Sequence, residues 1–379
     1  MNKFSQLIGV FVIVFFLSQC TVYKSYRDIV SLQRENFVSA EKRTPRLEYI
    51  NSIPVVYLYG TPREMGLQYG TLLKKQLNSL ATLIDELFPK SVIRKYMGIG
   101  KAAGKHLPER FNEELKGIAE ASGVDYFKLL ALNMAPRTTC SALAVWGKAT
   151  PNGELIMGRN ADYEFKSINK ALGLIVIKHP TTGYSTFSIS FLGLMGSYTG
   201  MNETGLSYGN MLVHNSKDPL ISTDGMPVQL LMQLAGEQYN NAHDMASFLS
   251  EQTHETPVNV MCADSNEAIV VELSHTAGNL RYGQKGVLAA TNFFLSPGLY
   301  KKYEPCDRFA TLMLSAKEHY GQFSVENMKE AMYRARRKGE NLQCILFEPA
   351  KQKLYVSINK VPASKGPFTE FDLKKMLKN

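Results

Sequence analysis

The chain has 379 residues, of which 45% are hydrophobic and 20% are charged, so it is long and apolar enough to bury a substantial core. This composition excludes a largely disordered protein. The net charge of +9 comes from scattered Lys and Arg residues that form no stripe interleaved with aromatic side chains. We therefore expect a solvated basic surface and no nucleic-acid partner, with attraction to anionic membranes or acidic substrates as the alternative.

The N-terminus carries a predicted targeting segment. A lysine near the start is followed by an unbroken apolar run at residues 7–17, which is too short for an ordinary membrane span. The run leads to Cys20 and resembles a bacterial lipoprotein signal, in which the cysteine is lipidated and becomes the new N-terminus. We expect a signal peptide at 1–19, lipidation of Cys20 and a polar tether over 20–45, giving a membrane-anchored lipoprotein of the cell envelope. Because Gln19 replaces the small residue usual before such a cysteine, a secreted or uncleaved form is the alternative.

The next part of the chain is predicted to be mostly helical. Apolar residues recur at helical spacing over 62–88, which predicts a long amphipathic helix, and further helices are expected at 108–122 and 126–134. The stretch "GIGKAAG" at 98–104 lacks the spacing of a phosphate-binding loop, so we interpret it as a flexible loop between helices.

After Cys140 the pattern changes to short β-branched and aromatic runs between Gly, Asn and Pro turns, which predicts strands. Asn152 and Gly153 give a strong hairpin signal between the first two runs. Because we find no repeat and no linker, we predict a single α+β domain whose sheets are covered by helices. The expected strands are 141–146, 154–159, 172–178, 185–191, 206–213, 258–263, 268–274, 343–347 and 353–358. The expected helices in this part are 227–234, 242–251, 307–316 and 325–335.

The five cysteines show no Cys-x-x-Cys pair and no Cys/His cluster, so we expect no metal site. A disulfide among Cys262, Cys306 and Cys344 is left open. Cys140 differs from these, because it stands at the start of a predicted strand, where a thiol can be exposed.

A catalytic thiol needs a proton acceptor within hydrogen-bond reach, and this acceptor is commonly a histidine. None of the seven histidines lies in a recognisable partner motif. Cleavage of the Thr139–Cys140 bond would remove the need for histidine, because the freed α-amine of Cys140 can act as the base. Such amines titrate near about 7.7–8.0 and thiols near about 8.5, so the two groups are nearly matched.

The run "TTCSALAVWGKATPNGELIMGRNADY" at 138–163 resembles the nucleophile segment of N-terminal-nucleophile hydrolases, in particular isopenicillin N acyltransferase-like proteins, acid ceramidase and choloylglycine hydrolase. The similarity covers most of the mature chain, from "GTPREMGLQYGTLL" through "GMNETGLSYGNML" to "ATNFF" and "DRF". It implies a four-layer αββα fold with two stacked antiparallel sheets. It also implies a helical pro-segment at 46–139 and a catalytic region at 140–379.

The resemblance also implies roles for individual residues. Cys140 would be the nucleophile and, through its freed amine, the general base. Asp162 would orient that amine, and Arg159 would neutralise nearby carboxylates and tune both groups. A structural ion pair between Arg159 and Asp162 within the hairpin is the alternative.

Three further residues follow from the same resemblance. Asn292 would donate a hydrogen bond to the oxyanion of the tetrahedral intermediate, and Arg308 would support the site electrostatically. Asn210 matches an active-site asparagine of related enzymes with a shift of one or two residues. The alternatives are a turn asparagine at 292 and a surface charge at 308.

Together these features predict a self-processing cysteine hydrolase that cleaves the linear amide bond of an N-acyl compound through an acyl-thioester on Cys140, without a metal or organic cofactor. Transfer of the acyl group to an acceptor amine is one alternative, and an inactive lipoprotein that binds an acylated ligand is another. The expected partners are a small N-acyl amide and the membrane reached through the lipid anchor. Because both fragments contribute to one core, we expect them to stay associated after cleavage at Thr139.

Overall fold

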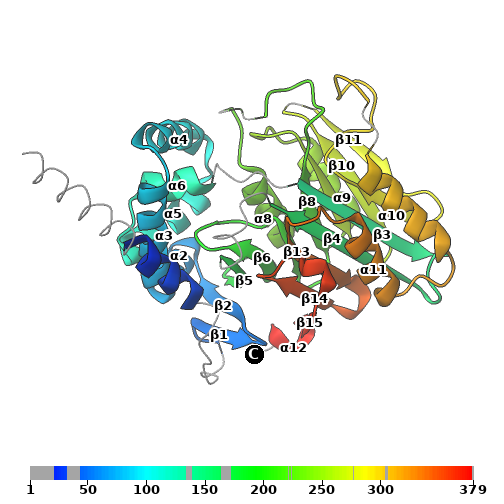
Figure 1. The fold of residues 1–379 in the computed structure, drawn as a ribbon, viewed down its shortest axis with the longest axis horizontal. Coiled ribbons are helices and arrows are strands. Elements are labelled where there is room, and N and C mark those ends of the chain that lie inside the picture. The colour runs from blue at the N-terminus through cyan, green and yellow to red at the C-terminus, as the bar shows by residue number, and fades with distance from the viewer. Residues whose placement is uncertain are drawn as a thin grey trace, which may run out of the picture.

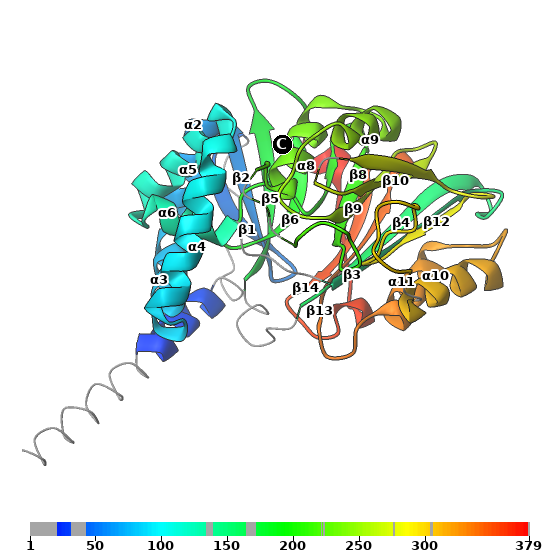
Figure 2. The same cartoon turned by 90° about the horizontal axis from the view of Figure 1, so that it is seen from above.

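Two β-sheets packed face to face form the centre of the protein, as a computed structural model of the chain shows (Figure 1). The structure describes residues 21–31, 43–133, 139–163, 172–220, 222, 224–275, 277–303 and 306–377. Helices cover the outer face of each sheet (Figure 2). The prediction of a four-layer αββα fold is confirmed.

The larger sheet has nine strands in the order β1-β2-β5-β6-β7-β8-β9-β10-β11. Neighbouring strands are antiparallel except β2 and β5, which run parallel. Strands β1 and β2 come from the predicted pro-segment, which is therefore not only helical. The strands are β1 (Arg46–Ile50), β2 (Ile53–Gly60), β5 (Gly173–Pro180), β6 (Thr186–Phe191), β7 (Thr199–Asn202), β8 (Ser207–Leu212), β9 (Val258–Ala263), β10 (Ala268–Leu273) and β11 (Gly278–Tyr282).

The smaller sheet has six strands in the order β12-β3-β4-β13-β14-β15, and every neighbouring pair is antiparallel. The Asn152-Gly153 turn joins β3 to β4, as the sequence predicts, and Gly153 has a φ of 79°, which favours glycine. The strands are β3 (Thr139–Gly147), β4 (Gly153–Asp162), β12 (Val287–Ala290), β13 (Asn341–Glu348), β14 (Lys353–Ile358) and β15 (Thr369–Asp372).

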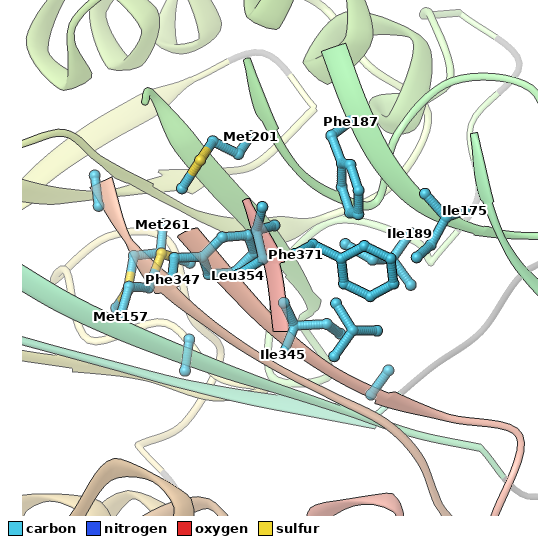
Figure 3. Close-up of a cluster of buried hydrophobic side chains, with 14 of the residues drawn as sticks. Met157, Ile175, Phe187, Ile189, Met201, Met261, Ile345, Phe347, Leu354 and Phe371 are labelled. Atoms are coloured by element: carbon cyan, nitrogen blue, oxygen red, sulfur yellow. The ribbon is translucent and has the colours of Figure 1, made fainter. Parts of the chain in front are cut away.

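The main core lies between the two sheets (Figure 3). Side chains alternate along a strand, so one face of each sheet contributes to this core. Phe187 and Met261 of the larger sheet and Met157 and Phe347 of the smaller sheet are all fully buried there. This packing fixes the relative position of the two sheets, and Cys140 belongs to the same cluster.

Two helices cover the outer face of the smaller sheet, α10 (Asp307–Glu318) and α11 (Val325–Ala335). Ser324 begins α11 with a capping box, in which its side chain accepts from the Asn327 N–H and Asn327 bonds back to Ser324. The sequence predicts both helices. A short helix, α12 (Leu373–Met376), follows β15.

The larger sheet is covered by helices from both parts of the chain. Around β8 to β10 these are α8 (Val228–Gln238) and α9 (Ala242–Ser250), and around β2 and β5 they come from the pro-segment. The helices of the predicted pro-segment are α2 (Pro62–Leu72), α3 (Lys74–Leu87), α4 (Lys90–Ala103), α5 (Glu109–Ser122) and α6 (Tyr126–Asn133).

Three details of the pro-segment differ from the sequence predictions. The single helix expected over 62–88 is divided at the buried Leu73 into α2 and α3. The loop expected at 98–104 is wrong, because α4 continues to Ala103. Its Gly100 packs so closely on α6 that a Cβ there would lie 3.1 Å from the Ala131 nitrogen.

Residues 21–31, which the sequence analysis assigns to a tether, form a helix instead. Ile29 is fully buried in the core cluster of the pro-segment helices, and Asp28 lies 3.1 Å from the Lys75 ammonium. Apolar residues at helical spacing explain this packing. Cys20 and the predicted signal peptide lie outside the described residues. Among the helices that the structure describes, none has both the length and the apolar character needed to cross a membrane.

Helices α2 and α5 pack closely because each has a glycine at the contact. A Cβ at Gly117 would lie 2.6 Å from the Arg63 oxygen and 2.8 Å from the Leu67 nitrogen, while Gly66 faces the Glu114 backbone from the other side. These contacts are tighter than a methyl group allows.

We predict that Gly117→Ala lowers the free energy of unfolding by about 1–3 kcal/mol, because α2 and α5 must move apart. Gly98→Ala is the matched control, since Gly98 is also helical but has no atom within 4 Å of its Cβ position. The free energy of unfolding of the Gly98→Ala control should rise by about 0.5–1 kcal/mol, because alanine favours a helix more than glycine does. Urea unfolding followed by circular dichroism measures both, and equal changes in the two variants would contradict the prediction.

Candidate active site

The β3–β4 hairpin places the predicted nucleophile segment at the centre of the protein. Ala142 lies opposite Arg159, Cys140 opposite Ala161, and Thr139 opposite Asp162. Directly opposite residues share a face of the sheet, and successive residues alternate. Cys140 and Arg159 therefore project into the core between the sheets, and Asp162 lies on the other face.

The Cys140 thiol contacts the guanidinium of Arg159, whose Nη2 lies 3.1 Å from Sγ. Both residues are almost completely buried, with exposed fractions of 0% and 1%. The expectation that Cys140 exposes its thiol is wrong for this uncleaved chain, because the larger sheet covers that face. The contact brings a positive charge to the sulfur, where it would stabilise a thiolate.

Asn210 on β8 holds Arg159 from the opposite sheet. The Asn210 main-chain oxygen accepts from Nε at 3.2 Å and from Nη2 at 2.9 Å, and its Oδ1 lies 3.2 Å from Nη2. The neighbouring Gly209 makes room, since a Cβ there would lie 2.8 Å from the Arg159 Cδ. The Nη1 atom of Arg159 is buried and has no hydrogen-bond partner among the described residues. It can donate to a bound molecule.

Asn292 follows β12 and contacts the main chain of Cys140. Its Oδ1 accepts from the Cys140 N–H at 2.8 Å and from Arg308 Nη2 at 2.7 Å. Its Nδ2 donates to the Leu212 oxygen. The predicted oxyanion donor is thus mainly an acceptor toward Cys140 in the uncleaved chain, and the second N–H of Nδ2 is the one that can serve an oxyanion.

Arg308, the second residue of α10, joins the two faces of the hairpin. Its Nη1 donates to the Cys140 oxygen at 2.9 Å and lies 3.5 Å from Asp162 Oδ2. The N-terminus of α10 therefore holds the Cys140 main chain from both sides, because Arg308 contacts the carbonyl directly and the N–H through Asn292.

Asp162 is fully buried at the end of β4. Its carboxylate accepts from Asn341 Nδ2 at 2.9 Å and from the Arg337 N–H at 3.2 Å. Burial raises the pKa of Asp162 from 3.8 to about 6, and the Asn341 hydrogen bond and the Arg308 charge oppose this rise. In the uncleaved chain, Asp162 is linked to Cys140 through Arg308.

The structure thus brings all six predicted residues together, namely Cys140, Arg159, Asp162, Asn210, Asn292 and Arg308. Thr139 is half-buried, and its hydroxyl donates to the Asp162 main-chain oxygen at 3.4 Å. Asn341 belongs to the same group of contacts but carries no signal in the sequence. Its position became meaningful only through the pairing of β13 with β4, in which Asn341 lies opposite Asp162.

Of the other described cysteines, Cys306 borders this network, because its Sγ accepts from the hydroxyl of Thr291, the residue before Asn292, at 3.4 Å. Cys262, Cys306 and Cys344 are free thiols, so no disulfide joins them. Cys344 faces the helices that cover the smaller sheet, and burial raises the pKa of its thiol well above the usual range. Among the described residues there is no group of three or more His, Cys, Asp or Glu side chains arranged to hold a metal ion.

A protein-family model matches residues 148–360, which is more than half of the chain. The chain belongs to the acyl-coenzyme A:6-aminopenicillanic acid acyl-transferase family. This membership confirms the predicted resemblance to isopenicillin N acyltransferase-like proteins. The part that matches the family contains Arg159, Asp162, Asn210, Asn292 and Arg308, and it begins after Cys140.

Individual relatives are more distant. Protein dcd1B of Dictyostelium discoideum is 26% identical over 264 residues, which are 59% of this chain and 51% of that protein. The chain spans about half the length of the curated relatives it matches first.

Solved structures also resemble this fold. The N-acylethanolamine-hydrolyzing acid amidase ortholog of Caenorhabditis elegans has a TM-score of 0.45 at 20% identity, over 55% of this chain and 93% of that one. A mutant form of the conjugated bile acid hydrolase of Clostridium perfringens has a TM-score of 0.42 at 16% identity, over 62% of this chain and 93% of that one.

The raised pKa of Asp162 predicts a pH-dependent stability. A raised carboxyl pKa favours folding below about pH 4, and this contribution is lost as the pH rises through about 6. The shift of about two units corresponds to about 3 kcal/mol at most. Between about pH 4 and about pH 8, the unfolding free energy of Asp162→Asn should therefore rise relative to wild type by about 1–3 kcal/mol.

Denaturant unfolding at several pH values measures this difference. Asp244→Asn is the control, because hydrogen bonding from Asn241 lowers the pKa of the exposed Asp244 carboxyl. Its stability relative to wild type should fall as the pH rises. A difference for Asp162→Asn that stays constant with pH would show that Asp162 does not titrate as described.

Proposed function

We propose that the protein is a self-processing cysteine amidase that hydrolyses the linear amide bond of an N-acyl compound. The observation that carries this proposal is that one hydrogen-bond network holds both the thiol and the backbone nitrogen of Cys140, through Arg159 and Asn292. In an N-terminal nucleophile these two atoms are the attacking group and its base. Membership in a family named for acyl transfer involving an amine supports the same bond chemistry.

Self-processing would use the Cys140 thiol against its own preceding carbonyl. Sγ attacks the Thr139 carbon and forms a thioester. The Thr139–Cys140 bond breaks, and the thiol proton passes to the Cys140 nitrogen, which becomes a free amine. Water then hydrolyses the thioester, which gives a carboxylate on Thr139 and returns the free thiol. Arg159 lies where it would stabilise the ionised sulfur, at 3.1 Å from Sγ.

The processed enzyme would run the same chemistry on a substrate. The Cys140 amine takes the thiol proton, and the sulfur attacks the amide carbonyl. The ammonium then protonates the leaving amine, the C–N bond breaks, and an acyl-thioester remains. Water, deprotonated by the same amine, releases the carboxylate and restores the thiol.

The surrounding residues would stabilise the charges that develop in these steps. The second N–H of Asn292 Nδ2 would donate to the oxyanion, and losing one such donor commonly costs about 2.7–4 kcal/mol. Asp162 and Arg308 would hold the new amine terminus, because Arg308 already contacts the Cys140 oxygen and the carboxylate of Asp162. Arg159 Nη1 offers a further buried donor to the substrate.

Acyl transfer is the second candidate, because the family name describes an acyltransferase. The acyl-thioester is common to both reactions, and only the acceptor differs. An acceptor amine added to the assay would appear as a new amide if transfer occurs, and free carboxylate alone would indicate hydrolysis.

The two fragments would remain together after cleavage. Strand β2 of the pro-segment pairs with β5 over six residue positions inside the larger sheet. Glu114 forms a buried ion pair with Lys178 at 2.6 Å, and Arg110 contacts the buried Glu237. Separation would expose this sheet edge and leave buried charges without partners. Lipidation of Cys20, with anchoring to the cell envelope, is part of the same proposal.

Cys140→Ala tests the mechanism. The wild type should give two bands on a denaturing gel, with one new N-terminus at Cys140 by mass spectrometry, and should release amine from N-acyl amides of varied chain length. Cys140→Ala should remain a single chain without turnover, because both the nucleophile and the cleavage are lost. Cys262→Ala is the control and should be cleaved and active. An uncleaved wild type that is fully active, or an active Cys140→Ala variant, would overturn the proposal.

The anchor is tested separately. Labelled fatty acid supplied to bacteria that express the full chain should be incorporated into wild type and not into Cys20→Ala, and the variant should leave the membrane fraction. Equal labelling of both proteins would exclude Cys20 as the lipidated residue.

A further inference from the structure

The segment that carries Asn292 is held by polar side chains of the larger sheet. Asn292 itself follows β12 of the smaller sheet and lies outside any strand. Such a segment has no sheet hydrogen bonds of its own to fix it, so the position of the Asn292 side chain depends on other contacts. Those contacts come from β9, from β10 and from the residues after β8.

The His214 N–H donates to the main-chain oxygen of Asn292 itself at 3.0 Å. Asn259 holds the residues on either side of Asn292. Its Nδ2 donates to the main-chain oxygens of Thr291 and Phe293, both at 2.9 Å. A side-chain amide has two N–H groups, so one donates on each side of Asn292. Asn259 is fully buried on β9, where Val258 to Ala263 pair with strands on both sides. The donor is therefore rigid.

We propose that Asn259 is the positioning residue for Asn292, and this rests on the catalytic use of Asn292 in the proposed function. Among the described residues, Asn259 makes no hydrogen bond to Cys140 or Arg308. Its effect passes through the backbone of Thr291 and Phe293. By fixing both peptide groups around Asn292, it keeps the Asn292 Oδ1 within 2.8 Å of the Cys140 nitrogen.

Other side chains hold the residues that follow. Asn215 Oδ1 accepts from the Phe294 N–H at 2.8 Å, and the buried Glu272 accepts from the N–H groups of Leu295 at 3.0 Å and Ser296 at 2.7 Å. These contacts explain why the segment would stay folded without Asn259. Next to the nucleophile, Asn292 would keep the bond from the His214 N–H and its own bond to the Leu212 oxygen, but the peptide groups on either side of it would lose the donors that fix their orientation.

A small shift is sufficient to affect catalysis. Asn292 accepts from both Cys140 and Arg308 with near-ideal distances of 2.8 and 2.7 Å. A displacement of about 1 Å in a positioned group can cost about 100-fold in rate. The effect falls on the chemical step, so kcat should change more than KM.

Asn259→Asp is the decisive variant, because it keeps the shape of the side chain and replaces the double donor with carboxylate oxygen. Asn202→Asp is the matched control. Asn202 is also fully buried, and its Nδ2 donates to two main-chain oxygens, of Gly236 and Tyr239, both at 2.8 Å. It is the last residue of β7 and bonds to the C-terminal end of α8, outside the network around Cys140.

Two measurements are made on the full-length protein. Hydrogen exchange by mass spectrometry reports the protection of the peptide around residue 292. Steady-state kinetics with an N-acyl amide that the wild type hydrolyses reports kcat and KM at about pH 5 and about pH 8. For Asn259→Asp at the higher pH, we expect faster exchange in this peptide and a kcat reduced by about 10- to 100-fold with KM within about 3-fold. At the lower pH, kcat relative to wild type should recover in part, because a protonated carboxyl can donate one hydrogen bond.

The control should show neither the local exchange nor the loss of kcat, even if both variants lose similar stability. Unchanged exchange around residue 292 in Asn259→Asp overturns the proposal, and so does a normal kcat or an equal loss of kcat in the control. If the wild type hydrolyses no amide, the proposed function fails. In that case the hydrogen-exchange data alone test whether Asn259 fixes the position of Asn292. Equal protection around residue 292 in Asn259→Asp and in wild type would overturn this claim.

Discussion

A guanidinium buried between two β-sheets is the constraint on which the site depends. Arg159 is 1% exposed, and removing a charged group from water is costly unless its hydrogen bonds are replaced. The replacement comes from the Asn210 carbonyl and side chain and from the Cys140 thiol. The small residues Ala142 and Ala161 on the same face of the hairpin, and Gly209 opposite, provide the necessary space. The cation therefore lies next to the sulfur for reasons of packing as much as of chemistry.

This constraint requires that the two sheets pack in one defined relative position. Cys140 and Arg159 belong to the smaller sheet, whereas Asn210 belongs to the larger one. Asn292 bridges them, because it follows a strand of the smaller sheet and donates to Leu212 at the end of β8. The core between the sheets, with Phe187 and Met261 on one side and Met157 and Phe347 on the other, sets their separation (Figure 3). Hydrophobic packing thus defines the geometry that the polar site uses.

The sequence predicted most of this arrangement where local patterns carry the information. Strands β9 and β14 and helix α11 have the predicted limits, because their apolar periodicity and caps are clear. Helix α4 continues through the predicted loop, which was expected there because glycines such as Gly98 and Gly100 are typical of loops. The close approach to α6 that Gly100 permits is a tertiary feature. Residues 21–31 looked polar enough for a tether, yet a few apolar residues sufficed to dock them.

In the site, too, residues within local motifs were predictable and residues identified only by tertiary contacts were not. The six predicted residues meet in space, although the motifs that suggested them are spread from Cys140 to Arg308. Asn341 and Asn259 had no local signal, because an asparagine inside a strand is meaningful only once its cross-strand neighbours are known. The burial of the thiol was also not predictable. The larger sheet covers the thiol, and its strands come from parts of the sequence on both sides of the β3–β4 hairpin.

The parallel pairing of β2 with β5 has a consequence for how the molecule is assembled. While the chain is continuous, the first two strands of the larger sheet are delivered by tethering, at a high effective concentration. A break before Cys140 would turn the same association into a meeting of two separate polypeptides, so refolding would depend on protein concentration. The native state of the cleaved protein would then persist because it unfolds slowly. Once unfolded in dilute solution, the two fragments would not refold together.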